Sequence, residues 1–479
     1  MKKLWIALAV IISGLCWYFS FDLSGDYGYL LWFAPIPVLL VSFYTSVKQT
    51  FVIAGTAYLI GRLSWLSYLL TVLPVVMAIV FTILFPLIFA SIAVITRKIV
   101  VVKQSKWSVF SFPVLWSLFE FILCKFSADG TAGSIAYSES NLLPLIQVAS
   151  LTGILGITFL ITLFPSAVAI AIYYRHNKKF LLPSVISFLL ILISILYGVI
   201  RMNSTSPGQT TMTAGLAVID EKFHSETNNP KPGDEIHVAD LYAEEISKLA
   251  RQGAQVIVLP EKMVNITATV GFPVKSIIAN AATNNHVTIV AGYTEFTNDS
   301  IKQNMALVVS QGNLLADYQK INLFEGEAMN GFVPGNKTAT FSLNNIPSGV
   351  AICKDLDYQD FIRTYTADKI QVLFVPAWDF ITDGWLHSRM AILRGVENGF
   401  TIIRTARQGQ LTISDYRGKV LYEASCTNNK AVSLIATVSL QPIQTFYSRF
   451  GDWFGYINTI AAIYFLFLLI RKQKQNLSV

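Results

Sequence analysis

Three side chains in the second half of this sequence could act together in acyl transfer. Glu261 follows the apolar run Val256–Leu259, Lys320 follows a second β-type run, and Cys353 ends the apolar run 349–352. A carboxylate can accept the thiol proton, the thiol can attack a carbonyl carbon, and an ammonium group can stabilise the resulting oxyanion. Because open α/β sheets build their sites at the carboxyl ends of strands, we expect these side chains to meet there.

Each of these residues also has an ordinary structural interpretation. Cys353 could pack as a small core residue, Glu261 could be a surface acid, and Lys320 could be a solvated lysine after a hairpin. The charged segment 354–358 follows Cys353 directly and predicts a strand-to-turn position, where the backbone N–H of Lys354 could face an oxyanion. Nearby cations are expected to favour the reactive thiolate.

The distribution of apolar residues predicts a membrane protein that carries one globular domain. The chain has 479 residues, of which 53% are hydrophobic and 14% charged. We expect seven transmembrane spans over 1–200, a linker over 201–211, a catalytic domain over 212–446 and a last transmembrane helix over 453–470. The segment 1–200 is almost continuously apolar, whereas the globular segment has an ordinary mixture of residues.

Eight apolar segments approach the roughly 20-residue length that a bilayer core requires. They are 4–21, 28–45, 51–71, 74–96, 107–125, 150–173, 180–200 and 453–470. Lys and Arg fall on alternate loops, which predicts that both termini are cytoplasmic and that the globular domain lies on the far face of the membrane. This distribution accounts for much of the net charge of +7, and the dispersed charges of the globular domain argue against nucleic-acid binding.

Strand-like and helix-like segments alternate within the globular domain. Predicted strands are 213–219, 256–259, 287–293, 350–353, 372–376 and 401–405, predicted helices are 235–252, 274–284 and 385–398, and a hairpin joins 305–310 to 314–318. This order predicts a mixed-sheet α/β sandwich.

Several motifs resemble the nitrilase, or carbon–nitrogen hydrolase, superfamily and, within it, the bacterial apolipoprotein N-acyltransferase family. They are Leu259–Glu261, Gln319–Lys320, Phe324–Glu327, Ala351–Cys353 and His387–Asn398 in the domain, with Pro113–Glu120 and Pro144–Gly153 in the spans. The resemblance implies a nitrilase-like αββα sandwich joined to a polytopic α-helical membrane bundle. It implies Glu261 as general base, Lys320 as oxyanion stabiliser and Cys353 as nucleophile. Supporting roles are implied for Glu327, with Glu325 as its competitor.

The reaction implied by the resemblance has two steps at the extracytoplasmic face of the bacterial inner membrane. Cys353 takes an acyl chain from a phospholipid as a thioester, and the N-terminal amine of a diacylglyceryl-modified lipoprotein then attacks that thioester. The expected partners are therefore a phospholipid donor and a diacylated lipoprotein acceptor. We expect no metal and no other cofactor, because the sequence has no zinc-type ligand spacing and no Gly-rich phosphate loop.

Five segments differ from the family pattern. They are Asp355, where these acyltransferases usually carry Glu, together with Lys262–Val264, Pro376–Phe380, Thr405–Gly409 and the nitrilase-like Phe332–Asn336. These differences keep the Glu-Lys-Cys chemistry but leave the acceptor open. The alternatives are a membrane-anchored amidase that uses water, and an inactive nitrilase-fold scaffold.

Aromatic residues near the predicted site are candidate lipid contacts or, equally, core residues. They are Trp378, Phe380 and Trp385, and the loops Phe272–Val274 and Trp378–Ile381 are expected to contact lipid. Lys354 and Asp355 are candidate supporting residues beside the nucleophile, whereas His387 is expected to be structural.

Two ionisable residues in the predicted spans and the four cysteines are further candidates for functional residues. Arg62 and Glu120 lie in predicted spans, where such residues are functional or pair within the bundle. Cys16 and Cys124 also lie in spans. The other two cysteines, Cys353 and Cys426, could form a disulfide in an oxidising compartment, which would silence the nucleophile.

Overall fold

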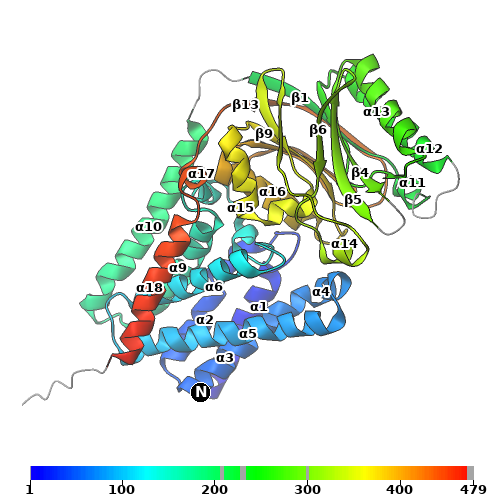
Figure 1. The fold of residues 1–479 in the computed structure, drawn as a ribbon. Helices are drawn as coiled ribbons and strands as arrows, with labels where there is room; N and C mark the ends of the chain where they lie inside the picture. The colour runs from blue at the N-terminus through cyan, green and yellow to red at the C-terminus, as the bar shows by residue number, and fades with distance from the viewer. Residues whose placement is uncertain (1, 205–209, 227–232, 298–300, 472–479) are drawn as a thin grey trace, which may run out of the picture. The chain divides into compact units, whose positions relative to one another are not determined.

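The computed structural model describes residues 2–204, 210–226, 233–297 and 301–471, and the chain forms two compact units (Figure 1). The helical unit contains Met1–Ala128, Gly133–Met202 and Asp452–Val479, and the α/β unit contains Asp129–Ala132 and Asn203–Gly451. The short segment Asp129–Ala132 thus belongs with the α/β unit, although it lies between two long helices in the sequence.

The helical unit has six helices that are long and apolar enough to cross a membrane, among the residues that the structure describes. They are α1 (Lys2–Ser20), α5 (Val75–Arg97), α6 (Ser111–Phe126), α9 (Ile154–Tyr173), α10 (Lys178–Asn203) and α18 (Trp453–Ile470). The protein is therefore a multi-pass membrane protein. Within the predicted linker 201–211, α10 continues to Asn203 and β1 begins at Thr210, while residues 205–209 lie outside the described residues.

Two of the eight predicted spans are shorter helices. The segment 28–45 forms the turn η1 (Gly28–Trp32) and the helix α2 (Pro35–Phe43). The segment 51–71 is divided, because α3 (Val47–Arg62) ends in a 3-10 turn before α4 (Leu66–Val72) begins. Hydropathy measures how apolar a segment is, but it does not register a turn between two apolar helices.

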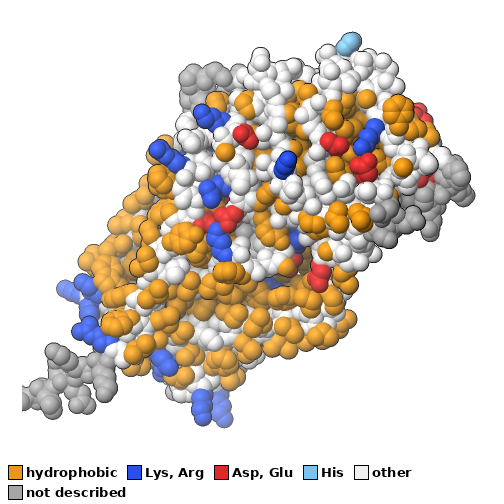
Figure 2. All heavy atoms as spheres, viewed as in Figure 1, with side chains coloured by type: hydrophobic (Ala, Val, Ile, Leu, Met, Phe, Trp, Pro, Cys, Tyr) orange, Lys and Arg blue, Asp and Glu red, His pale blue; other side chains and the backbone are white. Residues whose placement is uncertain are grey.

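Hydrophobic side chains cover the visible face of the helical unit (Figure 2). Among the most exposed are Val76 on α5, Leu182 on α10 and Ile460 on α18. A soluble protein rarely exposes so many large apolar side chains together, whereas lipid tails would cover them.

The two ionisable residues of the predicted spans are buried within the helical unit. Arg62 has its guanidinium 4.8 Å from the ring centre of Phe85 and 4.9 Å from that of Trp65. Glu120 accepts hydrogen bonds from the indole N–H of Trp116, the backbone N–H of Ile135 and two hydroxyl groups, those of Ser134 and Thr158. Both residues thus have partners inside the bundle.

The α/β unit contains two mixed sheets. The first has the spatial order β13 (Val432–Leu440), β1 (Thr210–Val218), β2 (Val256–Val258), β4 (Thr288–Phe296), β5 (Lys302–Ser310) and β6 (Asn313–Gln319), with β3 (Asn265–Ile266) beside β4. The second has the order β12 (Val420–Ser425), β11 (Gln410–Ser414), β10 (Thr401–Arg407), β9 (Val372–Trp378), β8 (Ile346–Val350) and β7 (Ala339–Leu343). In each sheet three adjacent strands run parallel, and their outer neighbours are antiparallel.

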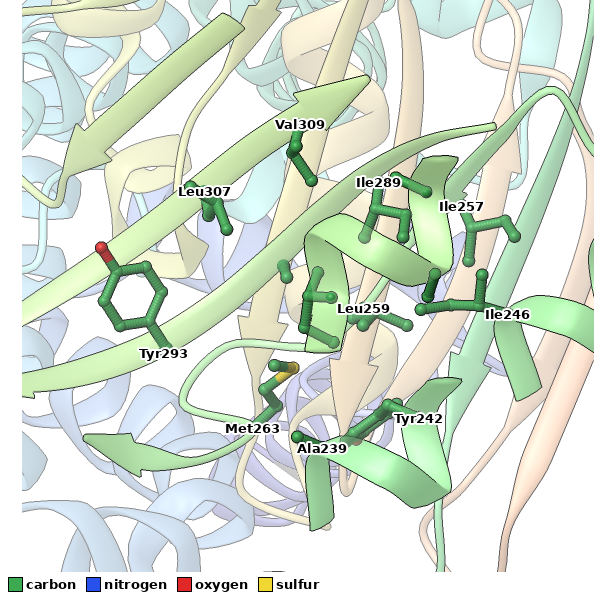
Figure 3. Packing of buried hydrophobic residues seen from close by; sticks show 14 of the residues in the cluster. Ala239, Tyr242, Ile246, Ile257, Leu259, Met263, Ile289, Tyr293, Leu307 and Val309 are labelled. Atoms are coloured by element: carbon green, nitrogen blue, oxygen red, sulfur yellow. The ribbon is translucent and has the colours of Figure 1, made fainter. Parts of the chain in front are cut away.

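Alternating side chains of the first sheet enter two separate cores. On β2, Val256 and Val258 point into the core shared with the second sheet, while Ile257 points toward the helices on the outer face. That outer core packs against α12 (Asp234–Arg251) and α13 (Gly271–Asn285), as Figure 3 shows for ten labelled residues.

The outer face of the second sheet is covered in the same way. Leu373 and Val375 of β9 pack with Ile362 of α15 (Gln359–Thr364) and Ala391 of α16 (Gly384–Asn398). The unit is therefore an αββα sandwich, and the predicted fold class is confirmed. The sequence did not indicate five of the strands, which are β3, β7, β11, β12 and β13.

Candidate active site

Glu261 lies just beyond the carboxyl end of β2. Its backbone N–H donates to the carbonyl oxygen of Ala377 at 3.2 Å, which joins the two sheets at this point. A Cβ atom on Gly292 would lie 2.6 Å from the Cα atom of Glu261. Only glycine at this position of β4 therefore allows the strand to pass so close to the Glu261 backbone.

Lys320 follows β6 and connects two carboxylates. Its ammonium group donates to Oε1 of Glu261 at 2.8 Å and to Oε2 of Glu327 at 2.9 Å. All three side chains are buried. Burial lowers the pKa of Lys320, but the two carboxylates outweigh this effect and hold the pKa well above its usual range, so the lysine stays charged.

Asn304 on β5 is a site residue that sequence reasoning missed. Its side-chain Nδ2 donates to Glu261 at 2.6 Å and to Glu327 at 2.7 Å, and its backbone carbonyl oxygen accepts from the Lys320 backbone N–H at 2.8 Å. An amide in the middle of a buried hairpin strand was the only sequence signal for this role. Asn304 fixes the distance between the two carboxylates.

Of the two candidate glutamates, Glu327 is the one that contacts Lys320. Glu327, in the helix α14 (Glu325–Met329), makes the ion pair, whereas Glu325 is exposed. Burial raises the pKa of Glu327, but Lys320 and Lys262 hold it well below its usual value, so this carboxylate remains ionised. Glu327 also accepts from the Phe324 backbone N–H at 2.9 Å.

Cys353 begins the 3-10 turn η6 (Cys353–Asp357), three residues after β8 ends at Val350. The prediction that the strand continues to the cysteine was therefore wrong. Cys353 has φ +44°, a left-handed conformation that a non-glycine residue adopts at some energetic cost and that is frequent at functional sites. Its thiol lies 3.5 Å from the carbonyl oxygen of Trp378 at the end of β9.

The electrostatic surroundings of Cys353 differ from the sequence-based expectation. Burial and the nearby Glu261 carboxylate raise the pKa of the thiol well above its usual value, and Lys320 opposes them without reversing the shift. The resting side chain is thus a protonated thiol rather than a thiolate. A nucleophilic role would require a base to take the proton during attack.

Asp355 holds the cysteine turn against the strand that carries the lysine. It accepts from the Tyr318 hydroxyl at 2.6 Å, from the Ile352 backbone N–H at 2.9 Å and from both the backbone and side-chain amides of Asn322. Lys354 points elsewhere, because its ammonium group pairs with Asp129 at 2.7 Å. Asp355 thus connects η6 to β6 and to the segment that follows β6.

Trp378 is half-buried between two cations. The Arg407 guanidinium lies 4.1 Å from the ring centre and the Lys262 ammonium 5.6 Å from it. The indole N–H donates to Gln408 Oε1 at 2.9 Å. Its ring is therefore held by protein groups, while its carbonyl oxygen faces the thiol.

The other candidate lipid contacts divide into exposed and buried residues. Phe380 and Ile381 are 40% and 46% exposed, and Phe272 is 82% exposed. Val274, by contrast, is a core residue of the outer face, and Trp385 is half-buried. Each of the two loops that were predicted to contact lipid thus exposes apolar side chains at only some of its positions.

A second buried ion pair lies beside the site. Arg404 on β10 binds both carboxylate oxygens of Asp379, at 2.5 and 3.0 Å. His387, on α16, lies 3.2 Å from Asp383 and 3.8 Å from Asp357. Burial lowers the pKa of His387, but these carboxylates outweigh it and raise the pKa to about 9.

The four cysteines are free thiols, so Cys353 and Cys426 are not bridged. Cys426 is buried and its thiol donates to the carbonyl oxygen of Ala406 at 2.9 Å. Within the described ranges, no group of three or more His, Cys, Asp or Glu side chains could hold a metal ion.

Comparison with known families assigns the α/β unit first. Residues 225–447 match the carbon-nitrogen hydrolase family, so this chain is an enzyme of the nitrilase superfamily. The 2-oxoglutaramate amidase of Bacillus subtilis is 28% identical over 181 residues, which cover 35% of this chain and 68% of that protein.

The helical unit narrows the family assignment within the nitrilase superfamily. Residues 13–168 match the family described as apolipoprotein N-acyltransferase N-terminal domain. The apolipoprotein N-acyltransferase of Geobacter metallireducens is 24% identical over 97% of this chain and 95% of its own length. That of Aquifex aeolicus is 24% identical over 66% of this chain and 73% of its own length. With both domains in one chain, the protein belongs to the apolipoprotein N-acyltransferase family.

Proposed function

We propose that this protein transfers an acyl chain from a phospholipid, through a thioester on Cys353, to the N-terminal amine of a diacylated lipoprotein. The observation that carries the proposal is the buried Lys320 that bridges Glu261 and Glu327 beside the protonated thiol of Cys353. The family assignment of both units supports the same activity.

In the first half-reaction Glu261 takes the proton from Cys353 as the sulfur attacks the ester carbonyl carbon of the phospholipid. The carbonyl oxygen becomes an oxyanion, which the Lys320 ammonium and the Lys354 backbone N–H stabilise. When the intermediate collapses, the carbon–oxygen bond breaks and the lysophospholipid alkoxide takes the proton from Glu261. Cys353 is left as an acyl thioester.

In the second half-reaction the free amine of the lipoprotein attacks the thioester carbon. Glu261 accepts the amine proton, the carbon–sulfur bond breaks, and the thiolate recovers the proton from Glu261. The products are an amide and the resting thiol. Glu261 begins each half-reaction as a carboxylate, holds one proton while the tetrahedral intermediate exists and then returns it, so the two steps need no other titrating group.

The membrane arrangement belongs to the same proposal. Eight crossings, with the shorter α2 and α3 among them, would leave both termini in the cytoplasm of a bacterium and the α/β unit outside the inner membrane. Exposed Phe380 and Ile381 would then contact acyl chains, since they are the apolar side chains that follow Trp378.

A second candidate is a membrane-anchored amidase that uses water as acceptor. The match to the 2-oxoglutaramate amidase and the nitrilase-like segment Phe332–Asn336 favour it. Both reactions would pass through an acyl-Cys353 intermediate, but the amidase would form it from an amide and resolve it with water.

Intact-mass spectrometry of the purified protein with phosphatidylethanolamine or phosphatidylglycerol micelles tests the proposal, with Cys353→Ala as control. We expect an acyl mass on the wild type only, which disappears when a synthetic diacylated lipopeptide is added and reappears on the lipopeptide amine. Release as free fatty acid regardless of lipopeptide would favour the hydrolase. No adduct with either phospholipid would reject the acyltransferase and leave a non-lipid amidase or an inactive scaffold.

A further inference from the structure

Three segments that differ from the family pattern lie together beside the nucleophile. Lys262 and Arg407 flank the ring of Trp378, and Arg407 Nη1 donates to the Lys262 carbonyl oxygen at 3.0 Å. Trp378 is also the residue whose carbonyl oxygen faces the Cys353 thiol. The differences from the family are therefore concentrated at one edge of the site.

Lys262 contacts the charged network directly. Its ammonium group lies 2.5 Å from Oε1 of Glu327, while Lys320 binds Oε2 of the same carboxylate at 2.9 Å. The Phe332 ring lies 4.6 Å from the Lys262 ammonium on another side. Lys262 has φ +51°, a conformation that persists in a non-glycine residue only where its surroundings fix it.

The charge of this network depends on Lys262. Without it, Glu261, Glu327 and Lys320 together carry one negative charge, and with it the four residues are neutral. A negative network would oppose both the loss of a proton from Cys353 and the growth of an oxyanion, because charges interact strongly at buried sites.

We propose that Lys262 is a positioning residue, which neutralises Glu327 so that the Lys320 ammonium remains available to the reacting thiol and oxyanion. The proposal deepens the acyl-transfer mechanism and rests on Cys353 being its nucleophile. Lys262 acts through Glu327 and touches neither the sulfur nor the acyl group.

The other charged groups around the thiol do not replace this effect. Glu261, Lys320, Asp379 and Arg404 face Cys353 from the ends of β2, β6 and β9 and from β10. Asp379 and Arg404 form a bidentate pair and cancel each other at close range. The balance near the thiol is therefore set by the four-residue network.

The test measures alkylation of Cys353 by iodoacetamide from pH 6 to pH 10 in the full-length protein, followed by the mass of the peptide that contains Cys353. We expect Lys262→Met to slow alkylation about 10-fold at neutral pH and to move the profile upward by about one pH unit. Lys262→Gln keeps a hydrogen-bond donor without the charge and should behave in the same way. Lys262→Arg should restore the wild-type profile.

The matched control is Lys275→Met, since Lys275 pairs with Glu295 at 3.4 Å elsewhere in the same unit. It should leave the profile unchanged. If Lys262→Met only loosened the fold, alkylation would become faster rather than slower and the unfolding temperature would fall. That result, a wild-type profile in Lys262→Met, or a wild-type profile in Lys262→Gln would each overturn the proposal.

Alkylation requires no phospholipid and no lipoprotein, which separates this test from that of the proposed function. If the wild-type protein never forms an acyl adduct, the proposed acyltransferase activity is rejected, but the alkylation profiles of the Lys262 variants still test the role of Lys262. A normal acyl adduct with unaltered Lys262 profiles would reject the role of Lys262 alone.

Discussion

Two buried carboxylates, one in each unit, differ in the groups that surround them. Glu120 of the helical unit accepts hydrogen bonds from four neutral donors, and it takes part in none of the ion pairs formed by the described residues. Glu261 of the α/β unit shares the Lys320 ammonium with Glu327 and lies near a thiol. The sequence singled out both residues as ionisable groups in apolar surroundings.

The difference is whether the carboxylate can gain and lose a proton while its hydrogen-bond donors keep another acceptor. The donors to Glu120 belong to packed helices and to the turn η5 (Ile135–Glu139) with its N-cap Ser134. The carboxylate therefore links these segments through hydrogen bonds. The partners of Glu261 are a lysine and an amide that remain satisfied by Glu327 when the Glu261 proton state changes. A carboxylate in the second setting can gain and lose a proton without breaking the fold.

The largest effect is expected from Glu261→Gln. The side chain keeps its shape and an oxygen for Lys320 but cannot accept a proton, so acylation of Cys353 should fall about 10³-fold. The unfolding temperature should change little, because the glutamine oxygen can still accept from Lys320 and Asn304 and because Lys320 keeps its ion pair with Glu327. Acylation rates by mass spectrometry and thermal unfolding in one detergent check both expectations; activity within tenfold of wild type would contradict the role of Glu261 as base.

Glu120→Leu should give the opposite pattern. It leaves the Trp116 and Ile135 N–H groups buried without an acceptor, which should destabilise the protein by about 3 kcal/mol. Acylation per folded molecule should stay within about threefold of wild type, because the hydrogen-bond donors to Glu120 all belong to the helical unit. Thermal unfolding and activity of the same preparation provide the measurement, and Glu120→Gln is the milder control. A large loss of activity without loss of stability would break the comparison.

Asn304→Ala tests how closely the carboxylates of Glu261 and Glu327 must be held for acylation. Removing the amide that binds both Glu261 and Glu327 should lower acylation about 30-fold through misplacement of the base. Asn285→Ala on α13 is the matched control, because its amide binds Ser247 and a helical carbonyl instead. Equal activities of the two variants would show that Asn304 does not position the base.

His387 should produce the smallest effect, seen as a pH dependence of stability. Its pKa is raised from 6.5 to about 9 in the folded state, where burial alone would lower it and the Asp383 and Asp357 carboxylates reverse that effect. The stabilisation is therefore fully present below pH 6.5 and is lost as the pH rises through 9. We expect a loss on the order of 1 kcal/mol across this window.

His387→Asn should remove this part of the pH dependence, which thermal unfolding between pH 6 and pH 10 would reveal. His224 is the internal reference, because burial and Arg407 lower its pKa to about 4. Its contribution changes only below pH 6.5, where the unfolded state binds the proton first. If the pH dependence of the unfolding temperature is unchanged in His387→Asn, the loss of stability at alkaline pH must arise from another group.

The sequence predicted the elements whose local pattern is strong. The buried strand before Glu261, the hairpin before Lys320 and the helix 385–398 are all present, since their apolar periodicity reflects burial directly. The edge strands β7 and β12 were missed, because short half-exposed strands lack that periodicity. Turns between apolar helices were missed for a related reason, because hydropathy does not change at such a turn.

The sequence by itself determined that a membrane bundle is joined to an α/β unit, and it predicted that Glu261, Lys320 and Cys353 would lie close together. Only the tertiary structure decided that Glu327 rather than Glu325 serves Lys320, that Asn304 and Lys262 complete the network, and that Cys353 rests as a protonated thiol. Ion pairing and the burial of charge depend on distances between segments far apart in the chain. Local sequence patterns do not encode those distances, so the protonation states of the site follow from the fold.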